Sequence, residues 1–206
     1  LVKFIVMIRN GNKMIDIKKI SEKSKNIKEF SLNYFKRLKN IFKSIDEKEL
    51  LNFEKILLKA RSKGNTIFVF GNGGSASTAT TMANDLGFDI IKKTKSKKTF
   101  RFFSLNDNTS VLTAIANDVG YENIFINQLK IHFRRGDIAI ILSASGNSKN
   151  LIQAAKWLKK NKGKVLSIVG FDGGNLKKIS DSCLYFKTEK TEYGPIEDIH
   201  LIINHI

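Results

Sequence analysis

The sequence predicts an α/β fold, a three-layer αβα sandwich around a five-stranded parallel sheet of the flavodoxin-like kind. Apolar runs that do not alternate with polar residues, such as residues 66–70 and 137–142, are typical of strands buried on both faces. Helical patterns separate successive runs, and crossover helices between strands give a parallel sheet covered on both sides. Two runs end in turns rich in glycine or hydroxyl groups, where such sheets bind ligands.

Strand and helix patterns alternate along the chain. The expected strands are residues 66–70, 99–105, 137–142, 165–169 and 183–186. The helices expected between and after them are residues 75–86, 109–116, 124–131, 150–160 and 176–180, with a last helix from Ile196. Pro195 falls in the first turn of that last helix, where its missing N–H breaks no hydrogen bond.

The chain before the first strand is expected to be helical. Apolar residues recur every three, four or seven positions, so residues 14–43 are expected to form one long amphipathic helix. Its apolar stripe is longer than a small domain can cover, which predicts a role in oligomerisation. Ser44 and Glu47 fit a capping box for a second helix that ends near Gly64. Residues 14–63 are therefore expected to form a helical hairpin.

One domain is expected. The chain begins with Leu1 rather than methionine, and residues 1–13 are expected to be a non-native or upstream extension without function. Residues 14–206 then form a single domain, because 206 residues supply one core of ordinary size. With 42% hydrophobic residues and clear periodicity, the chain is not expected to be disordered.

The single cysteine, Cys183, cannot form a disulfide within the chain. It lies in the apolar run 183–186, which favours a buried structural thiol over a nucleophile and fits a reducing cytoplasm. No apolar stretch approaches the roughly 18 residues of a membrane-spanning helix. These features predict a cytoplasmic protein without a membrane partner.

The formal charge of +17 raises the question of a nucleic-acid partner. The excess is almost entirely lysine, spread over polar helix faces apart from a cluster at residues 92–98. No zinc-finger, homeodomain or RNA-recognition pattern is present. Compositional bias toward lysine is sufficient to explain the charge, so a nucleic-acid role ranks third among the functions considered. The charge would in any case attract small anions.

A glycine-rich turn follows the strand expected at residues 66–70. Its glycines allow the backbone to turn sharply and its N–H groups to approach a ligand closely. The first N–H groups of the next helix have no partner within it and lie at the positive end of its dipole, so they bind anions. The candidate anion-binding residues are Asn72, Gly73, Gly74 and Ser75. The simpler alternative, a tight turn without a ligand, stays open.

A second turn carries similar chemistry. After residues 137–142, hydroxyl groups and a glycine precede a helix and offer donors that can surround a phosphate without a cation. The candidate residues are Ser143, Ser145, Asn147 and Ser148. Turns that follow two parallel strands open at the same edge of the sheet. Both turns are therefore expected to close on one phosphoryl group, with Ser75 and Ser148 facing a shared cavity.

Four motifs follow one another: Gly71-Asn-Gly-Gly-Ser-Ala-Ser77, Leu112-Thr-Ala-Ile-Ala-Asn-Asp118, Ser143-Ala-Ser-Gly-Asn-Ser148 and Gly170-Phe-Asp-Gly-Gly174. Together they resemble the sugar isomerase (SIS) domain, and within it the phosphoheptose isomerase group. The resemblance implies isomerisation of sedoheptulose 7-phosphate to D-glycero-D-manno-heptose 7-phosphate for lipopolysaccharide or capsule biosynthesis. It also implies a homotetramer whose sites are completed by neighbouring subunits. Asn117 and Asp118 either line the sugar or brace the loop.

The resemblance also implies which residues react. Aldose–ketose isomerisation moves a proton between adjacent carbons through an enediol, so it needs a base for the carbon acid and an acid for the oxygens. The glutamate and last-helix histidine that do this in the resembled isomerases fall on Asp85 and His205. Glu197 is a third catalytic candidate, with stabilisation of the helix N-terminus as its alternative role. For His200, a core histidine and a catalytic histidine are both open.

No metal or other cofactor is expected. The resembled isomerases hold zinc with two histidines, a glutamate and a glutamine, and the positions of their zinc site fall on Thr81, Asp85, Glu197 and His205. Thr81 is a poor zinc ligand, and the remaining donors are richer in oxygen than zinc sites usually are.

A second function, from a different class, keeps the sugar-phosphate pocket and discards catalysis. The residues at Thr81 and Asp85 favour a binding or regulatory protein, similar to the SIS-family member that tetramerises and binds a bacterial replication initiator. Tight phosphosugar binding without turnover, or capture of a protein partner, would distinguish it. In both interpretations the small-molecule partner is a phosphorylated sugar of the heptose phosphate class.

Overall fold

The computed structural model describes residues 16–190 and 192–206 of the chain. The expected extension, residues 1–13, lies outside these ranges. A five-stranded sheet in the order β2-β1-β3-β4-β5 forms the centre, and every neighbouring pair is parallel. The strands are β1 Thr66–Gly71, β2 Arg101–Ser104, β3 Ile138–Ser143, β4 Lys164–Val169 and β5 Ser182–Tyr185. The predicted fold class is confirmed.

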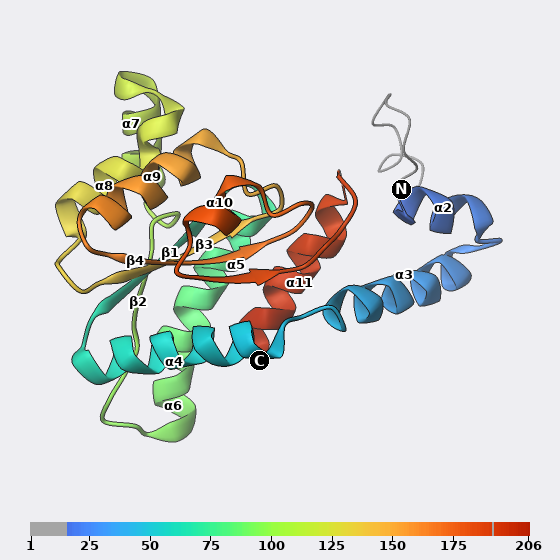
Figure 1. Ribbon diagram of the computed structural model, residues 1–206, viewed down its shortest axis with the longest axis horizontal. Helices are drawn as coiled ribbons and strands as arrows, with labels where there is room; N and C mark the ends of the chain where they lie inside the picture. Colours follow the sequence, from blue (N-terminus) through green and yellow to red (C-terminus); the bar gives the residue numbers. More distant parts are fainter. Residues whose placement is uncertain (1–15, 191) are drawn as a thin grey trace.

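Helices cover both faces of the sheet and complete the three layers (Figure 1). One face is packed by α4 Glu47–Lys63, α5 Gly74–Asn84 and α11 Tyr193–His205. The other is packed by α7 Thr109–Val119, α8 Ile124–His132, α9 Lys149–Lys160 and α10 Gly174–Ile179. The remaining elements are α2 Asp16–Lys23, α3 Ile27–Phe42, α6 Ile90–Thr94, the π-helix η1 Asp85–Asp89 and the 3₁₀ turn η2 Tyr121–Asn123. In this described part of the chain, no helix has both the length and the apolar character needed to span a bilayer.

The strands are apolar at successive positions because both of their faces are covered. In β1, Ile67 and Val69 belong to the core beneath α4, α5 and α11, while Phe68 and Phe70 belong to the core on the other face. All six positions of β3 are buried. The continuous apolar runs in the sequence therefore reflect burial on both sides of the sheet.

The register of the two central strands brings the two predicted turns together. Gly71, the last residue of β1, pairs with Leu142 of β3. Ser143 then ends β3, so both turns leave neighbouring strands at the carboxyl edge of the sheet. This edge is where α/β proteins bind their ligands.

The single helix predicted for residues 14–43 is wrong, because the described part contains two helices. α2 ends at Lys23 and α3 begins at Ile27. Between them Asn26 has an extended backbone, and its side chain accepts a hydrogen bond from the Glu29 N–H at 3.0 Å. Asparagine favours such N-cap geometry over the interior of a helix, so it ends one helix and starts the next.

The predicted capping box at Ser44 and Glu47 does not form. The Ser44 hydroxyl donates back to the Ile41 carbonyl at 2.6 Å. Asp46 caps α4 instead, and its carboxylate accepts two N–H groups of the first turn at 2.9 and 3.3 Å. A charged acceptor at the positive end of a helix dipole is more favourable than a neutral hydroxyl.

Helix α3 extends away from the sheet and lies nearly end to end with α4 in Figure 1, whereas the sequence predicts a hairpin. Its apolar side chains Ile27, Leu32 and Phe35 are 64%, 55% and 66% exposed. The Tyr34 hydroxyl donates to the Asp198 carboxylate of α11. Burial raises the pKa of the Tyr34 hydroxyl, and the hydrogen bond to Asp198 raises it further. Helix α3 is therefore fixed to α11 on one side and exposes apolar residues elsewhere.

A buried ion pair adds to this attachment. Arg37 of α3 donates to both carboxylate oxygens of Glu192, at 2.7 and 3.2 Å. The Glu192 side chain is fully buried and also accepts from the Glu189 N–H at 2.8 Å. Helix α3 is therefore bonded both to α11, at Asp198, and to the residue that immediately precedes α11, Glu192.

Replacing Asp46 with alanine should lower the free energy of unfolding by about 1 kcal/mol, because α4 loses the acceptor of two of its first N–H groups. Urea denaturation followed by circular dichroism measures the change. Ser44→Ala is the matched control and should have a clearly smaller effect, since that hydroxyl bonds only to a carbonyl. Equal losses in the two variants would contradict the assignment of the cap.

Candidate active site

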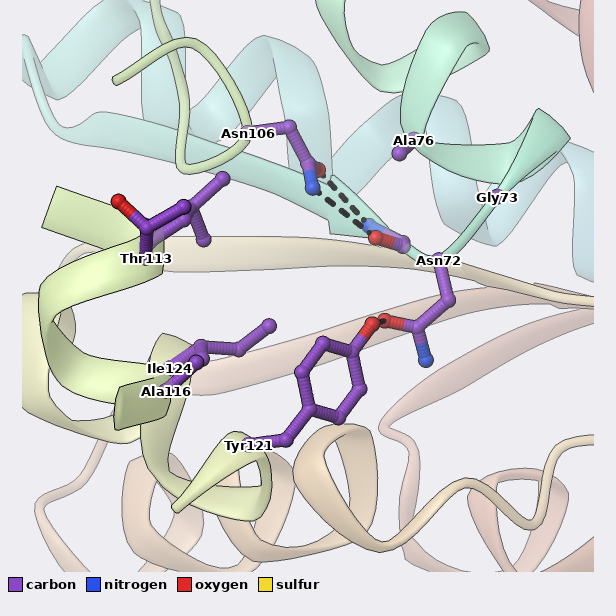
Figure 2. Close-up of a pocket in the computed structure, with 10 residues that line it drawn as sticks. Asn72, Gly73, Ala76, Asn106, Thr113, Ala116, Tyr121 and Ile124 are labelled. Atoms are coloured by element: carbon purple, nitrogen blue, oxygen red, sulfur yellow. Dashed lines mark hydrogen bonds between the residues drawn. The ribbon is translucent and has the colours of Figure 1, made fainter. Parts of the chain in front are cut away.

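The turn after β1 is shaped by glycine and by Asn106. Gly73 has a φ of +56°, in the left-handed region that favours glycine. A Cβ at Gly71 would approach the Leu142 carbonyl oxygen and the Ser75 side chain to 2.8 Å, so this position has no room for one. Asn106 accepts from the Gly71 N–H and donates to the Gly71 carbonyl, both at 3.1 Å (Figure 2).

The same turn is bonded to the first turn of α9. Asn72 and Asn150 exchange two amide hydrogen bonds, of 3.0 Å from Asn72 Nδ2 and 2.8 Å from Asn150 Nδ2. The Tyr121 hydroxyl donates to Asn72 Oδ1 at 3.0 Å (Figure 2). The first predicted turn is therefore bonded to the helix that follows the second.

A cavity of about 180 Å³ opens beside the first turn, between it and α7. Four polar side chains line it, those of Asn72, Asn106, Thr113 and Tyr121. Gly71, Gly73, Ala76, Leu112, Ala116 and Ile124 complete the lining. Figure 2 labels eight of them, which come from the turn after β1, α5, the segment after β2, α7, η2 and the start of α8.

Ser75 points into the core instead of into this cavity. It is 3% exposed, and its Oγ lies 3.3 Å from His200 Nδ1. His200 Nε2 lies 3.1 Å from the Ile168 carbonyl oxygen, which can only accept, so we assign the ring proton to Nε2. The Ser75 hydroxyl then donates to Nδ1. Burial lowers the pKa of His200 to about 4 and keeps the ring neutral. The interpretation of His200 as a core histidine is confirmed.

Two serine hydroxyls of the second turn accept hydrogen bonds from the backbone of the same turn. Ser143 Oγ accepts from the Gly146 N–H at 3.0 Å, and Ser145 Oγ accepts from the Asn147 N–H at 3.2 Å. Each of these hydroxyls still has its own proton to donate. Ser148 precedes α9 without making a side-chain capping bond. The turn therefore retains hydroxyl donors of the kind that a phosphate requires.

The expectation that Ser75 and Ser148 face one cavity is wrong for a single chain. The cavity beside the first turn is not lined by the second turn, and the Ser75 hydroxyl is directed toward His200. The second turn packs instead against the loop after β4, where a Cβ at Gly146 would lie 2.1 Å from the Gly173 carbonyl oxygen. The predicted phosphate-binding residues share one edge of the sheet, and of these eight residues Asn72 and Gly73 line the cavity beside the first turn.

Glu197 places a carboxylate over the amino end of α5. A Cβ at Gly74 would lie 2.3 Å from this carboxylate, and the Gly74 N–H hydrogen-bonds to it. Burial and then the charge of Asp198 raise the pKa of Glu197, while the Gly74 N–H acts in the opposite direction. An internal anion therefore occupies part of the helix N-terminus at which the sequence predicts a phosphate.

Asp85 and His205 lie together beyond the carboxyl end of α5. His205 Nε2 is 3.7 Å from Asp85 Oδ2, and the Asp85 side chain is 26% exposed. Asn204 Nδ2 donates to Asp85 Oδ2 at 2.6 Å, and Asn84 Nδ2 donates to Oδ1 at 3.0 Å. An oriented and accessible carboxylate thus lies beside an imidazole, an arrangement that can transfer protons.

Two further features distinguish this pair. The helix changes from α to π at Asp85, and π segments are rare and frequently lie at functional sites. Asn204 is 4% exposed, and its Oδ1 has no hydrogen-bond partner among the residues that the structure describes. A buried acceptor without a donor costs about 1–3 kcal/mol. The sequence pattern places Asn204 on the same helix face as Glu197 and His200, but it assigns Asn204 no role.

The three predicted catalytic residues do not meet within one chain. Glu197 lies at the amino end of α5, whereas Asp85 and His205 lie at its carboxyl end. Helix α5 has 11 residues, so about 16 Å separates the two groups.

The remaining predicted residues lie outside both groups. Asn117 donates to Asp118 at 2.9 Å, and both side chains are exposed on α7 without lining the cavity. A role for them in sugar binding stays a prediction. The Thr81 hydroxyl donates to the Ser77 carbonyl at 3.0 Å.

The described residues do not fit the zinc site that the resemblance implies. Of its four positions, only Asp85 and His205 are adjacent, and Thr81 contributes a hydroxyl that is already bonded. Across residues 16–190 and 192–206, no three histidine, cysteine or acidic side chains are grouped as metal ligands. Two donors do not make the four-coordinate site that zinc prefers. The expectation that the chain needs no cofactor stays a prediction, and the reaction below is derived from the chain's own side chains.

Comparison with known proteins identifies the class first. The family model described as the SIS domain matches residues 33–170, and the chain therefore belongs to the SIS domain family. Individual relatives indicate the group within this family. The chain is 35% identical over 162 residues to a probable phosphoheptose isomerase of Thermoplasma acidophilum, covering 76% of this chain and 86% of that protein. It is 36% identical over 179 residues to a phosphoheptose isomerase of Helicobacter pylori, covering 87% and 90%.

A solved structure agrees with these relatives. Phosphoheptose isomerase GmhA from Neisseria gonorrhoeae matches this fold with a TM-score of 0.75 and 26% identity, over 87% of this chain and 95% of that one. The resemblance to the phosphoheptose isomerase group that the four motifs indicate is confirmed.

The neutral His200 should make folding pH-dependent. The pKa of His200 falls from 6.5 in the unfolded chain to about 4 in the native protein. As the pH falls through this range, the unfolded chain therefore binds a proton that the native protein does not. The free energy of unfolding should therefore decrease as the pH falls from about 6.5 to 4, by up to about 3 kcal/mol from this group.

Urea denaturation at several pH values in this range, on the wild type and on His200→Gln, measures the effect. The substituted protein should show a shallower dependence on pH, because glutamine does not titrate. An unaltered slope in His200→Gln would contradict the assignment.

Proposed function

We propose that this chain is an aldose–ketose isomerase that converts sedoheptulose 7-phosphate to D-glycero-D-manno-heptose 7-phosphate for lipopolysaccharide or capsule biosynthesis. The relatives at 35% and 36% identity carry the name phosphoheptose isomerase. The observation that carries the proposal in this chain is the contact of Asp85 with His205, in which Asn204 holds the carboxylate.

Asp85 acts as the base in this proposal. It takes a proton from C1 of the ketose to give an enediol and returns the proton to C2, which yields the aldose. His205 transfers the second proton between the two oxygens, so the reaction needs no external oxidant or reductant. The enediol hydroxyls are donors of the kind that the buried Asn204 Oδ1 lacks.

The orientation of Asp85 matters because aspartate is one methylene shorter than the glutamate of the resembled isomerases. A displacement near 1 Å can reduce a rate on the order of a hundredfold. The hydrogen bonds from Asn84 and Asn204 restrict the carboxylate to one direction. Asn204 is therefore a positioning residue in this proposal.

A homotetramer with active sites shared between subunits is part of the proposal. The phosphate-binding turns and the Asp85–His205 pair lie at opposite ends of α5, about 16 Å apart, which is longer than one sugar phosphate. A second chain that brings its pair to the turns of the first would complete a site. The exposed apolar side chains of α3, Ile27, Leu32 and Phe35, offer a surface for such an assembly.

A cytoplasmic location belongs to the same proposal. Cys183 is a free thiol, and burial raises its pKa, which disfavours the reactive thiolate and agrees with a structural role in a reducing compartment.

Asp85→Asn should lower kcat for sedoheptulose 7-phosphate by at least about a hundredfold, because an amide cannot accept the proton from carbon. A coupled or chromatographic assay of the heptose product measures the rate. Asp89→Asn is the matched control: Asp89 lies in the same π-helix and, among the residues that the structure describes, its ion pair is with Lys93 at 3.5 Å, so the rate should stay within about twofold.

Absence of any aldose product from the wild-type protein, assayed with and without added zinc, would remove the proposed reaction. Tight binding of the sugar phosphate in that experiment would instead support the non-catalytic regulatory function.

Asn204→Leu should separate stability from activity. Leucine removes a buried acceptor that lacks a donor, so the free energy of unfolding should be unchanged or higher. The carboxylate of Asp85 loses its 2.6 Å hydrogen bond, so kcat should fall about tenfold or more while KM changes little. Steady-state kinetics and urea denaturation of the same preparation test this. A rise in KM alone would contradict the positioning role.

A further inference from the structure

A second cavity lies at the amino edge of the sheet, opposite the edge that carries the two predicted phosphate-binding turns. Its volume is about 290 Å³. The start of β1, the start of β2, the end of α8 and the turn after α8 form its walls. Strand β1 has six residues, so roughly 20 Å of strand lies between the two edges. None of the predicted catalytic or phosphate-binding residues lines this cavity.

The lining is cationic. It contains Arg101, His132 and Arg134 and no carboxylate. Arg101 makes one long hydrogen bond, of 3.4 Å to the Gly64 carbonyl, which leaves most of its guanidinium donors available. Among the residues that the structure describes, no ion pair joins these three side chains to an acidic group.

The nearest carboxylate is already engaged. Asp137 is 3% exposed, and its two oxygens accept from the N–H groups of Thr66 at 2.7 Å and Arg134 at 2.8 Å. These bonds fix the backbone of two residues that line the cavity. The Asp137 carboxylate therefore positions the backbone of the cavity wall. Its two hydrogen bonds come from backbone N–H groups and not from an arginine side chain.

An accessible aromatic ring completes the lining. Phe103 is 44% exposed, and its ring meets Phe68 edge to face at 6.0 Å. The His132 ring lies 5.2 Å from it. Arg101 and Phe103 are two residues apart on β2, so both point to the same face of the sheet. An exposed ring beside guanidinium groups is the combination that stacks a nucleobase and binds its phosphate.

We propose that this cavity binds a nucleoside phosphate, with the base against Phe103 and the phosphate between Arg101 and Arg134. A simple phosphate would use the arginines and leave the ring in water, while an apolar ligand would leave the arginines without partners. The same chemistry is offered by a free nucleotide and by one nucleotide unit of a nucleic acid.

Calorimetric titration of the full chain with ADP tests the proposal. ADP should bind saturably, more tightly than adenosine or inorganic phosphate alone. Arg134→Gln should weaken ADP binding about tenfold or more, since charge-assisted hydrogen bonds to phosphate are lost. Phe103→Leu should also weaken it, by removing the stacking surface while keeping an apolar side chain.

Arg135→Gln is the matched control. Arg135 is the exposed neighbour of Arg134, carries the same charge and does not line the cavity, so its loss should change ADP affinity by less than about twofold. Isomerase activity on sedoheptulose 7-phosphate should be unchanged in Arg134→Gln, because Arg134 follows α8 on one face of the sheet, whereas Asp85 and His205 belong to the helices that cover the other face. The nucleotide site and the proposed isomerase function can therefore fail independently.

A single-stranded oligonucleotide distinguishes the two sources of the ligand. Binding that is weaker than that of ADP supports a free nucleotide; tighter binding that Arg134→Gln also abolishes supports a nucleotide unit within a nucleic acid. Three results would overturn the proposal: no saturable binding of ADP, equal losses in Arg134→Gln and Arg135→Gln, or displacement of ADP by sedoheptulose 7-phosphate.

Discussion

Three polar contacts join α11 to α5 along the whole length of α5. Glu197 meets the Gly74 N–H at the amino end, His200 bonds Ser75 in the first turn, and Asn204 meets Asp85 at the carboxyl end. The middle contact is buried, and its histidine is neutral, so it needs no counter-charge. The positions of the helix N-terminus and of the Asp85–His205 pair depend on this packing, because the residues of both groups come from these two helices.

The sheet is the part of the structure that follows most directly from the sequence. Runs such as residues 67–70 and 138–142 are apolar at every position, which is typical of strands covered on both faces. Helix ends were harder to predict because capping is a local competition between neighbouring polar residues. Asp46 displaced Ser44 as the cap of α4, and Asn26 divided a helix whose apolar periodicity gave no sign of a break.

The candidate site could be predicted only in part. The parallel strands fix the two turns at one edge, so their proximity followed from the pattern of β1 and β3. The direction of the Ser75 side chain did not, because its partner His200 is 125 residues away in the chain. The role of Asn204 was missed for the same reason, since its hydrogen bond to Asp85 exists only once α11 lies on α5.

Helix α3 is attached to the rest of the protein by the Arg37–Glu192 pair, whose carboxylate is completely buried at the start of α11. Taking the partner away from a buried carboxylate costs about 3–5 kcal/mol. A neighbouring molecule that displaced α3 would either break this ion pair, at that cost in free energy, or move the start of α11 together with α3. A molecule bound to α3 would thus act on the start of α11, the helix that ends at His205.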